Sequence, residues 1–155
     1  MTSAPPSRVT AIHRQVDAAR DGRHPRLIAR LRSGWAVFGE RQFVRGYALL
    51  LPDPVVGDLN ALGAEERGVF LADMARLGDA LLEATGAVRI NYAMLGNEEP
   101  ALHAHVIPRY RDEPQALRTR HPFAYDWQAA PAFDAAAELE LTDAVRRALA
   151  RTAPE

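Results

Sequence analysis

Two histidines, His103 and His105, stand one residue apart in an apolar run that ends at Arg109. Such a run favours a β-strand, in which successive side chains point to opposite faces, so both imidazoles are expected on one surface. Imidazole is suited to nucleophilic and acid–base chemistry near neutral pH. Two rings on one strand could divide between them the attack on a phosphorus atom and the stabilisation of its oxygens. The pair therefore predicts a reaction centre.

Two other interpretations of the pair remain open. A His-x-His pair on a strand also suits a structural role, and two imidazoles on one face can hold zinc or iron when a third ligand arrives from elsewhere. The other histidines, His13, His24 and His121, have no metal-like spacing with the pair, and the chain has no cysteine. We therefore predict catalytic roles for His103 and His105 without a metal, and keep a metal enzyme as a less favoured alternative.

The sequence around the pair resembles the signature of the histidine triad (HIT) family. In that family a strand carries His-φ-His-φ-His-φ-φ, where φ is apolar, often ends in Pro-Arg, and follows an Asn-bearing strand. Residues 90–100 and 101–109 match this pattern, and residues 46–52 are similar to an earlier apolar strand that ends in proline. The likeness covers about residues 35–111, and its most specific part is the histidine strand.

One histidine of the triad is missing. Alignment on Val106-Ile107-Pro108-Arg109 makes His103 the middle histidine and His105 the third, and places Ala101 where the first should stand. The resemblance thus implies a divergent branch of the family that lacks the first histidine. The family nucleophile is the middle histidine, which this chain retains as His103.

The resemblance implies a hydrolase of nucleotide phosphoanhydrides or phosphoramidates, or a nucleotidyl transferase, acting through a nucleotidyl-histidine intermediate. Dinucleoside polyphosphates and nucleoside phosphoramidates are the expected substrate classes. His103 would attack the α-phosphorus, with a backbone carbonyl orienting its ring, and His105 would donate to a phosphate oxygen. No cofactor is expected, although the substrate could carry a divalent cation. A nucleotide-binding or regulatory protein with little turnover is the alternative, favoured by Ala101 and by an anionic Glu98 near the family's leaving-group position.

Five further residues are candidate substrate contacts. Asn91 is a polar residue inside an apolar strand, and Asn97 stands in the turn before the histidine strand, where it could contact a phosphate or leaving-group oxygen or serve only the turn. Glu40 and Gln42 fall near the family's acidic residue that binds the ribose hydroxyls. Arg109 could attract a phosphate, but it also suits an exposed position at the strand end.

Composition narrows the possible partners. A chain of 155 residues with 48% hydrophobic content is long enough for one domain with a sizeable core. The net charge of −1 lacks the basic character that long nucleic acids require, but is compatible with a small nucleotide. The absence of cysteine excludes disulfides and thiol catalysis. No apolar run suits a bilayer span or a secretion signal, so we expect a cytoplasmic protein.

Hydrophobic periodicity and turn residues predict an α+β fold, an antiparallel sheet with a long helix packed on one face, and the resemblance implies that this sheet is HIT-like. The domain would comprise an N-terminal helical arm (1–26), a core (27–111) and an irregular C-terminal tail with a short helix (112–155). The family resemblance also implies a homodimer, in which the sheets of the two protomers join and the tail of each reaches toward the partner's site. The expected elements are a helix at 7–19 capped by Ser7, a hairpin at 27–31 and 35–38, a strand at 46–51, a helix at 64–85, strands at 88–95 and 102–109, and a helix at 141–150.

Overall fold

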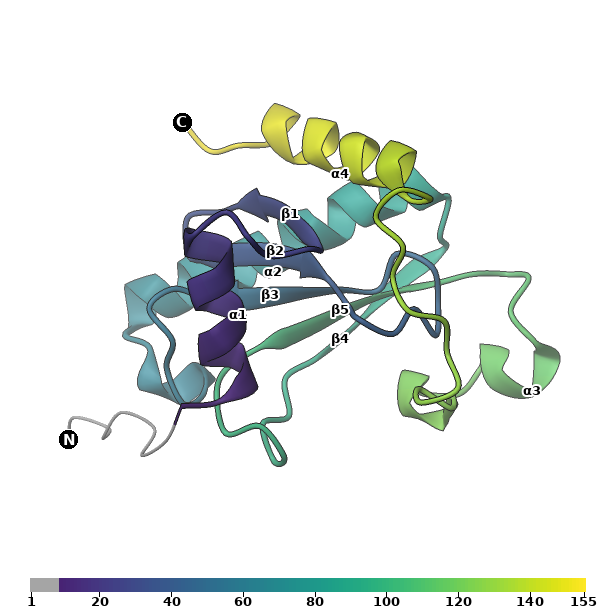
Figure 1. Ribbon diagram of the computed structural model, residues 1–155, viewed down its shortest axis with the longest axis horizontal. Helices are drawn as coiled ribbons and strands as arrows, with labels where there is room; N and C mark the ends of the chain where they lie inside the picture. The colour runs from purple at the N-terminus through teal and green to yellow at the C-terminus, as the bar shows by residue number, and fades with distance from the viewer. Residues whose placement is uncertain (1–8) are drawn as a thin grey trace.

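Five antiparallel strands form one sheet in the computed structural model, which describes residues 9–155 (Figure 1). The strand order is β1-β2-β3-β5-β4, and every neighbouring pair is antiparallel. The helices and strands are, in chain order, α1 (Ala11–Arg20), β1 (Leu27–Arg30), β2 (Gly34–Phe38), β3 (Ala48–Pro52), α2 (Ala64–Thr85), β4 (Arg89–Ala93), β5 (Ala104–Arg109), α3 (Gln115–Arg118) and α4 (Leu139–Arg151). Two short 3₁₀ helices lie at Leu59–Ala61 and Pro122–Ala124.

Strand β3 occupies the middle of the sheet because its residues are apolar on both faces. All five of its residues are buried, as expected for a strand covered on both sides. The predicted hairpin of β1 and β2 is confirmed, and β2 then pairs with β3 along its whole length. The sheet therefore carries two hydrophobic layers, one on each face.

Helices α2 and α4 cover one face. Helix α2 has the predicted bounds, and it ends where Gly86 adopts the left-handed conformation (φ 71°) that glycine tolerates. Its buried Phe70, Leu77 and Leu81 pack on the sheet with Leu50. Helix α4 lies beside α2 and runs slightly longer than predicted (Figure 1). In the part of the chain that the structure describes, no helix combines the length and apolar character needed to cross a membrane.

Helix α1 covers the opposite face, together with part of the tail (Figure 1). Its buried Ile12 and Val16 pack over the sheet residues of that face. The helix begins later than predicted, because the side chain of Thr10 accepts a hydrogen bond from the His13 backbone N–H and caps the first turn. The predicted cap, Ser7, lies outside the described residues.

The predicted pair of strands around the histidines is confirmed, although both strands are shorter than expected. Strand β4 pairs with β5, and β5 begins at Ala104, one residue after His103. Leu102, Ala104 and Val106 join the core beneath α2. His105 lies opposite Leu49 of β3, whose side chain belongs to the other layer. The histidine pair is thus on the α1 face.

The buried carboxylate of Asp73 offers a test of how α2 is attached to the sheet. Asp73 accepts hydrogen bonds from the backbone N–H (2.8 Å) and the hydroxyl (2.7 Å) of Ser33, in the turn between β1 and β2. We expect Asp73→Ala to lower the free energy of unfolding by about 2–3 kcal/mol, because the two donors of Ser33, and Arg76 on the same helix (3.2 Å), lose a buried anionic acceptor. Asp79→Ala, an exposed aspartate on the same helix, should change it by less than about 0.5 kcal/mol. Urea denaturation of both variants measures the difference, and equal effects would contradict this role.

Candidate active site

The ring of His103 is held by a main-chain carbonyl. Its Nδ1 lies 2.8 Å from the carbonyl oxygen of Ala101. A carbonyl can only accept, so Nδ1 carries the hydrogen, and in a neutral ring Nε2 then presents its lone pair. The backbone N–H of Leu102 donates to the carbonyl of Val56 (2.8 Å), which anchors the segment that supplies this acceptor. The His103 side chain is partly exposed, so its Nε2 side is not sealed in the core.

The ring of His105 has the opposite arrangement. Its Nδ1 lies 2.7 Å from the hydroxyl of Tyr47. Burial raises the pKa of the Tyr47 phenol, so the phenol keeps its proton. Among the described residues this hydroxyl has no other hydrogen-bond partner, and a buried O–H needs an acceptor. Tyr47 therefore donates to Nδ1, which leaves the hydrogen of the neutral ring on Nε2.

His105 is neutral over the physiological pH range. Burial, with a smaller contribution from the charge of His103, lowers the pKa of His105 to about 4. The ring centroids of the two histidines are 5.0 Å apart, and their planes are inclined by 72°. The site thus combines an imidazole that offers a lone pair with a neighbouring imidazole that offers an N–H. This combination suits attack on an electrophilic phosphorus and donation to one of its oxygens.

Tyr47 is a site residue that the sequence did not reveal. A tyrosine at the start of an apolar strand is an ordinary core residue, so no local pattern distinguishes it. The loop before β3 shapes its position: the Gln42 amide donates to the carbonyls of Gly39 (2.8 Å) and Tyr47 (2.9 Å) and accepts from the Gly46 N–H (2.9 Å). Gly39 is needed because a Cβ there would lie 2.1 Å from the Tyr47 ring.

This loop also corrects the predicted role of Gln42. Both amide hydrogens of Gln42 are used by main-chain carbonyls, so its side chain organises the loop and has no free donor for a ribose. Glu40 is exposed, and no hydrogen bond of its carboxylate is found among the described residues. Glu40 therefore retains a free carboxylate near the start of this loop, and its predicted contact with substrate stays a prediction.

Aromatic residues of the C-terminal tail enclose His105. The rings of Phe123 and Trp127 each lie 5.9 Å from the His105 ring in edge-on arrangements, and they stack on each other at 5.3 Å. Phe43 stacks beneath Trp127 at 3.8 Å. The tail thus packs against the site of its own protomer, and these aromatic side chains exclude water from one side of the His105 ring.

The predicted phosphate contact by Arg109 is wrong. Arg109 is buried, and it pairs with the carboxylate of Glu113 at 3.0 Å. Its remaining donors reach the Asn91 side chain (2.8 Å) and main-chain carbonyls that include that of Arg120 (2.7 Å). A charge inside the protein requires such partners, so the guanidinium is fully engaged and cannot bind substrate. The same bond engages the side-chain oxygen of Asn91, whose predicted contact with substrate stays a prediction.

The turn before β5 holds the last predicted residue. Asn97 and its neighbour Glu98 are exposed, and neither side chain forms a hydrogen bond within residues 9–155. The next residue, Glu99, instead accepts a hydrogen bond from the backbone N–H of Ala11 at 3.3 Å. Asn97 is therefore free to contact a ligand, but the structure shows no contact between this residue and the histidines.

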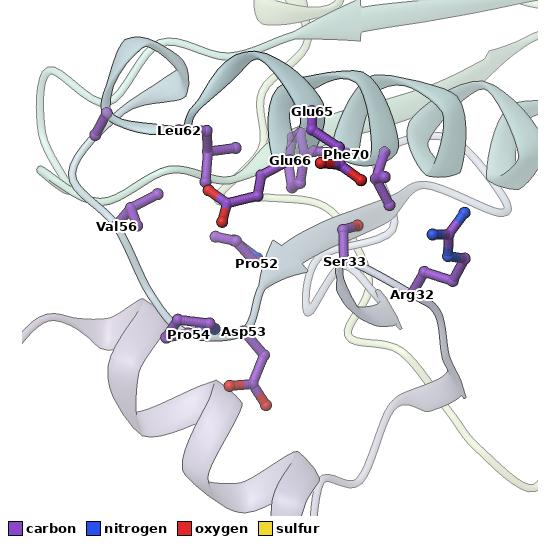
Figure 2. Close-up of a pocket in the computed structure, with 12 residues that line it drawn as sticks. Arg32, Ser33, Pro52, Asp53, Pro54, Val56, Leu62, Glu65, Glu66 and Phe70 are labelled. Atoms are coloured by element: carbon purple, nitrogen blue, oxygen red, sulfur yellow. The ribbon is translucent and has the colours of Figure 1, made fainter.

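Another cavity lies elsewhere on the molecule. It has a volume of about 500 Å³ and is lined by Pro52, Val56 and Phe70, with the carboxylates of Glu65 and Glu66 beside them (Figure 2). These carboxylates and that of Asp53, which also lines the cavity, would repel a phosphate, and the lining includes neither histidine, so we do not assign the reaction to it. Among the described residues, no group of three or more histidine, aspartate or glutamate side chains is placed to hold a metal ion. A metal at the pair would need a ligand from elsewhere.

Comparison with solved structures identifies the fold. A histidine triad protein from Bradyrhizobium japonicum is 24% identical, with 79% of this chain and 89% of that chain covered and a TM-score of 0.70. One from Marinobacter aquaeolei VT8 is 19% identical, with 94% and 100% covered and a TM-score of 0.71. A hypothetical histidine triad nucleotide-binding protein from Sulfolobus tokodaii strain7 is 11% identical, with 89% and 92% covered and a TM-score of 0.69.

The sequence comparisons found no equivalent: no protein-family model and no curated protein sequence matches this chain. The evidence of relationship is therefore the arrangement of the elements, which extends over most of this chain and of each of the three structures. The chain has the fold of the histidine triad family.

Proposed function

We propose that this protein transfers or hydrolyses nucleotidyl groups through a covalent intermediate on His103. The observation that carries the proposal is the pair of opposite tautomers, a lone pair on Nε2 of His103 and a hydrogen on Nε2 of His105, 5.0 Å apart between ring centroids. The fold shared with histidine triad proteins, one of them described as nucleotide-binding, supports a nucleotide as substrate. Dinucleoside polyphosphates and nucleoside phosphoramidates are the classes that we propose.

The reaction proceeds in two displacements. Nε2 of His103 attacks the α-phosphorus, the phosphorus–nitrogen bond forms, and the bond to the leaving group breaks with its electron pair on the leaving group. The carbonyl of Ala101 stabilises the positive charge that the ring acquires, and His105 donates to a phosphate oxygen. Water or another acceptor then attacks the phosphorus and loses its proton to solvent, the phosphorus–nitrogen bond breaks, and His103 regains its lone pair.

Loss of the first histidine is compatible with this mechanism. The acceptor for His103 is the main-chain carbonyl at position 101, which alanine supplies as well as histidine. Ala101 itself is fully buried against the α1 layer, so its small side chain serves packing.

Binding without turnover is the second candidate, and Glu98 favours it. Its exposed carboxylate lies in the turn beside Asn97, where an anion would repel a phosphate-bearing leaving group. No metal or other cofactor takes part in either proposal, and a divalent cation would enter only with the substrate. The expected cytoplasmic location, without membrane or long nucleic-acid partners, stays a prediction.

Replacement of His103 separates the two candidates. We expect His103→Ala to lower kcat for mononucleotide release by about 10³-fold or more, because the nucleophile is absent. Brief incubation of the wild-type protein with substrate, followed by denaturation at alkaline pH, where a phosphorus–nitrogen bond persists, and intact-mass spectrometry, should show one nucleotidyl group that His103→Ala lacks. Nucleotide binding by a wild-type protein that releases no mononucleotide and forms no adduct would favour the binding protein instead.

Nuclear magnetic resonance tests the role of Tyr47. The ¹⁵N shifts of His105 should show a neutral ring with its hydrogen on Nε2 and a titration midpoint near pH 4, since its pKa is lowered to about 4. Tyr47→Phe should populate both tautomers and lower kcat by about tenfold while KM changes little, because the phenol acts through His105. Tyr110→Phe, which removes a hydroxyl bonded to the Arg45 carbonyl, is the matched control. A His105 ring protonated on Nδ1 in the wild type would refute the assignment.

We also propose that two copies associate through β4. Strand β4 is at one edge of the sheet, and its outer edge has no partner among residues 9–155. Three exposed apolar side chains gather in or beside this strand, namely Val88 (52% exposed), Tyr92 (41%) and Leu95 (56%). An unpaired edge with apolar side chains is a ready template for pairing, and a second copy of β4 would extend the sheet.

Sedimentation velocity tests the association. The wild type should sediment as a dimer, and the double variant Val88→Arg/Leu95→Arg as a monomer, because charges at the new interface would be buried without partners. Leu139→Arg, which replaces an equally exposed leucine (57%) on α4, should remain dimeric. A monomeric wild type at micromolar concentration would count against this interface.

A further inference from the structure

A second concave site lies where β5 ends, and exposed arginines gather around it. The cavity has a volume of about 410 Å³ and is bounded by the end of β5, the start of β4 and the segment after α3. Its size falls in the range of small-molecule sites, about 300–1,000 Å³. Four exposed arginines line it: Arg89, Arg111, Arg118 and Arg120. Neither His103 nor His105 belongs to its lining.

These four guanidinium groups lack acidic partners. Within the described part of the chain, none of the four forms an ion pair, and neither aspartate nor glutamate lines the cavity. The nearby carboxylate of Glu113 is buried and already neutralised by Arg109. Asp112, which follows Arg111 in the sequence, is exposed but does not line the cavity. The cavity is therefore strongly positive.

Arg109 shapes the segment that presents two of these arginines. Its buried guanidinium donates to the carbonyls of Leu117 (3.0 Å), Arg118 (3.5 Å) and Arg120 (2.7 Å). These bonds fix the backbone after α3, so the side chains of Arg118 and Arg120 leave from a positioned main chain. A site organised in this way loses less conformational entropy on binding than flexible surface arginines would.

The other cavities do not share these properties. The cavity of about 500 Å³ contains the carboxylates of Asp53, Glu65 and Glu66. A third cavity is lined by Arg30, Arg32, Arg76 and Arg146, but there Arg30 pairs with Asp53, Arg76 pairs with Asp73, and Arg146 donates to main-chain carbonyls. In the cavity after β5, by contrast, all four exposed arginines are without an ion pair among the described residues, although Arg118 also donates to the Arg111 carbonyl (3.2 Å).

We propose that this cavity binds an oligophosphate, a chain of linked phosphates with several negative charges. Guanidinium groups form paired, charge-assisted hydrogen bonds with phosphate oxygens, and four of them match a chain better than one phosphate, which would leave positive charges uncompensated. The proposal goes beyond the function at the histidines and does not depend on it, because none of His103, His105 and Tyr47 lines this cavity.

Isothermal titration calorimetry with inorganic tripolyphosphate tests the site. The wild type should bind it, and Arg118→Gln/Arg120→Gln should weaken the affinity by about tenfold or more. Arg147→Gln, an exposed arginine in a cavity that also contains Glu140 and Asp143, is the matched control and should bind like the wild type. His103→Ala should also bind like the wild type, and inorganic orthophosphate should bind the wild type about tenfold more weakly than tripolyphosphate.

Four results would overturn the proposal. The first is a wild type that does not bind tripolyphosphate, and the second is orthophosphate binding as tight as that of tripolyphosphate. The third is an equal loss of affinity in Arg147→Gln, which would indicate general charge attraction. The fourth is a loss of affinity in His103→Ala, which would place the ligand at the histidines. If the double variant does not fold, Arg89→Gln provides the same comparison from the β4 side of the cavity.

Discussion

The antiparallel pairing of β3 with β5 is the constraint on which the candidate active site depends. It places His105 opposite Leu49, and Tyr47 precedes Leu49 by two residues, so both side chains lie on the same face of the sheet. The phenol can then donate to Nδ1 of His105 at 2.7 Å. A shift of the register by one residue would turn the imidazole into the α2 core and away from the phenol. The chemistry of one histidine is therefore set by a strand that lies more than fifty positions earlier in the chain.

A main-chain acceptor and a side-chain donor give the two imidazoles opposite tautomers. His103 donates to the carbonyl of Ala101, two residues away, so its tautomer depends on local backbone geometry. His105 accepts from Tyr47, so its tautomer depends on tertiary packing. This difference explains why a chain without the first histidine of the triad can still present a nucleophilic nitrogen. The first position contributes its carbonyl, and any residue that packs there can supply it.

The burial of Arg109 connects the sheet to the C-terminal tail. Its guanidinium joins the carboxylate of Glu113 to carbonyls after α3, and Glu113 also accepts the hydroxyl of Tyr125 at 2.6 Å. These bonds hold the segment that carries Phe123 and Trp127 against His105. The same network positions the arginines around the cavity at the end of β5. One buried charge thus organises both the wall of the candidate active site and a separate positive surface.

The sequence by itself determined the elements and the location of the histidine pair, because period-2 and period-3.6 patterns, glycines and prolines act locally. Helix α2 has its predicted bounds, and the alternation around His105 is as predicted. Only the tertiary structure decided which polar side chains remain available. Arg109 and Gln42 look like ligand contacts in the sequence, yet their side chains form hydrogen bonds within the protein. Tyr47 contacts His105 only because β3 pairs with β5. Hydrogen bonding depends on distances between segments, which no local pattern encodes.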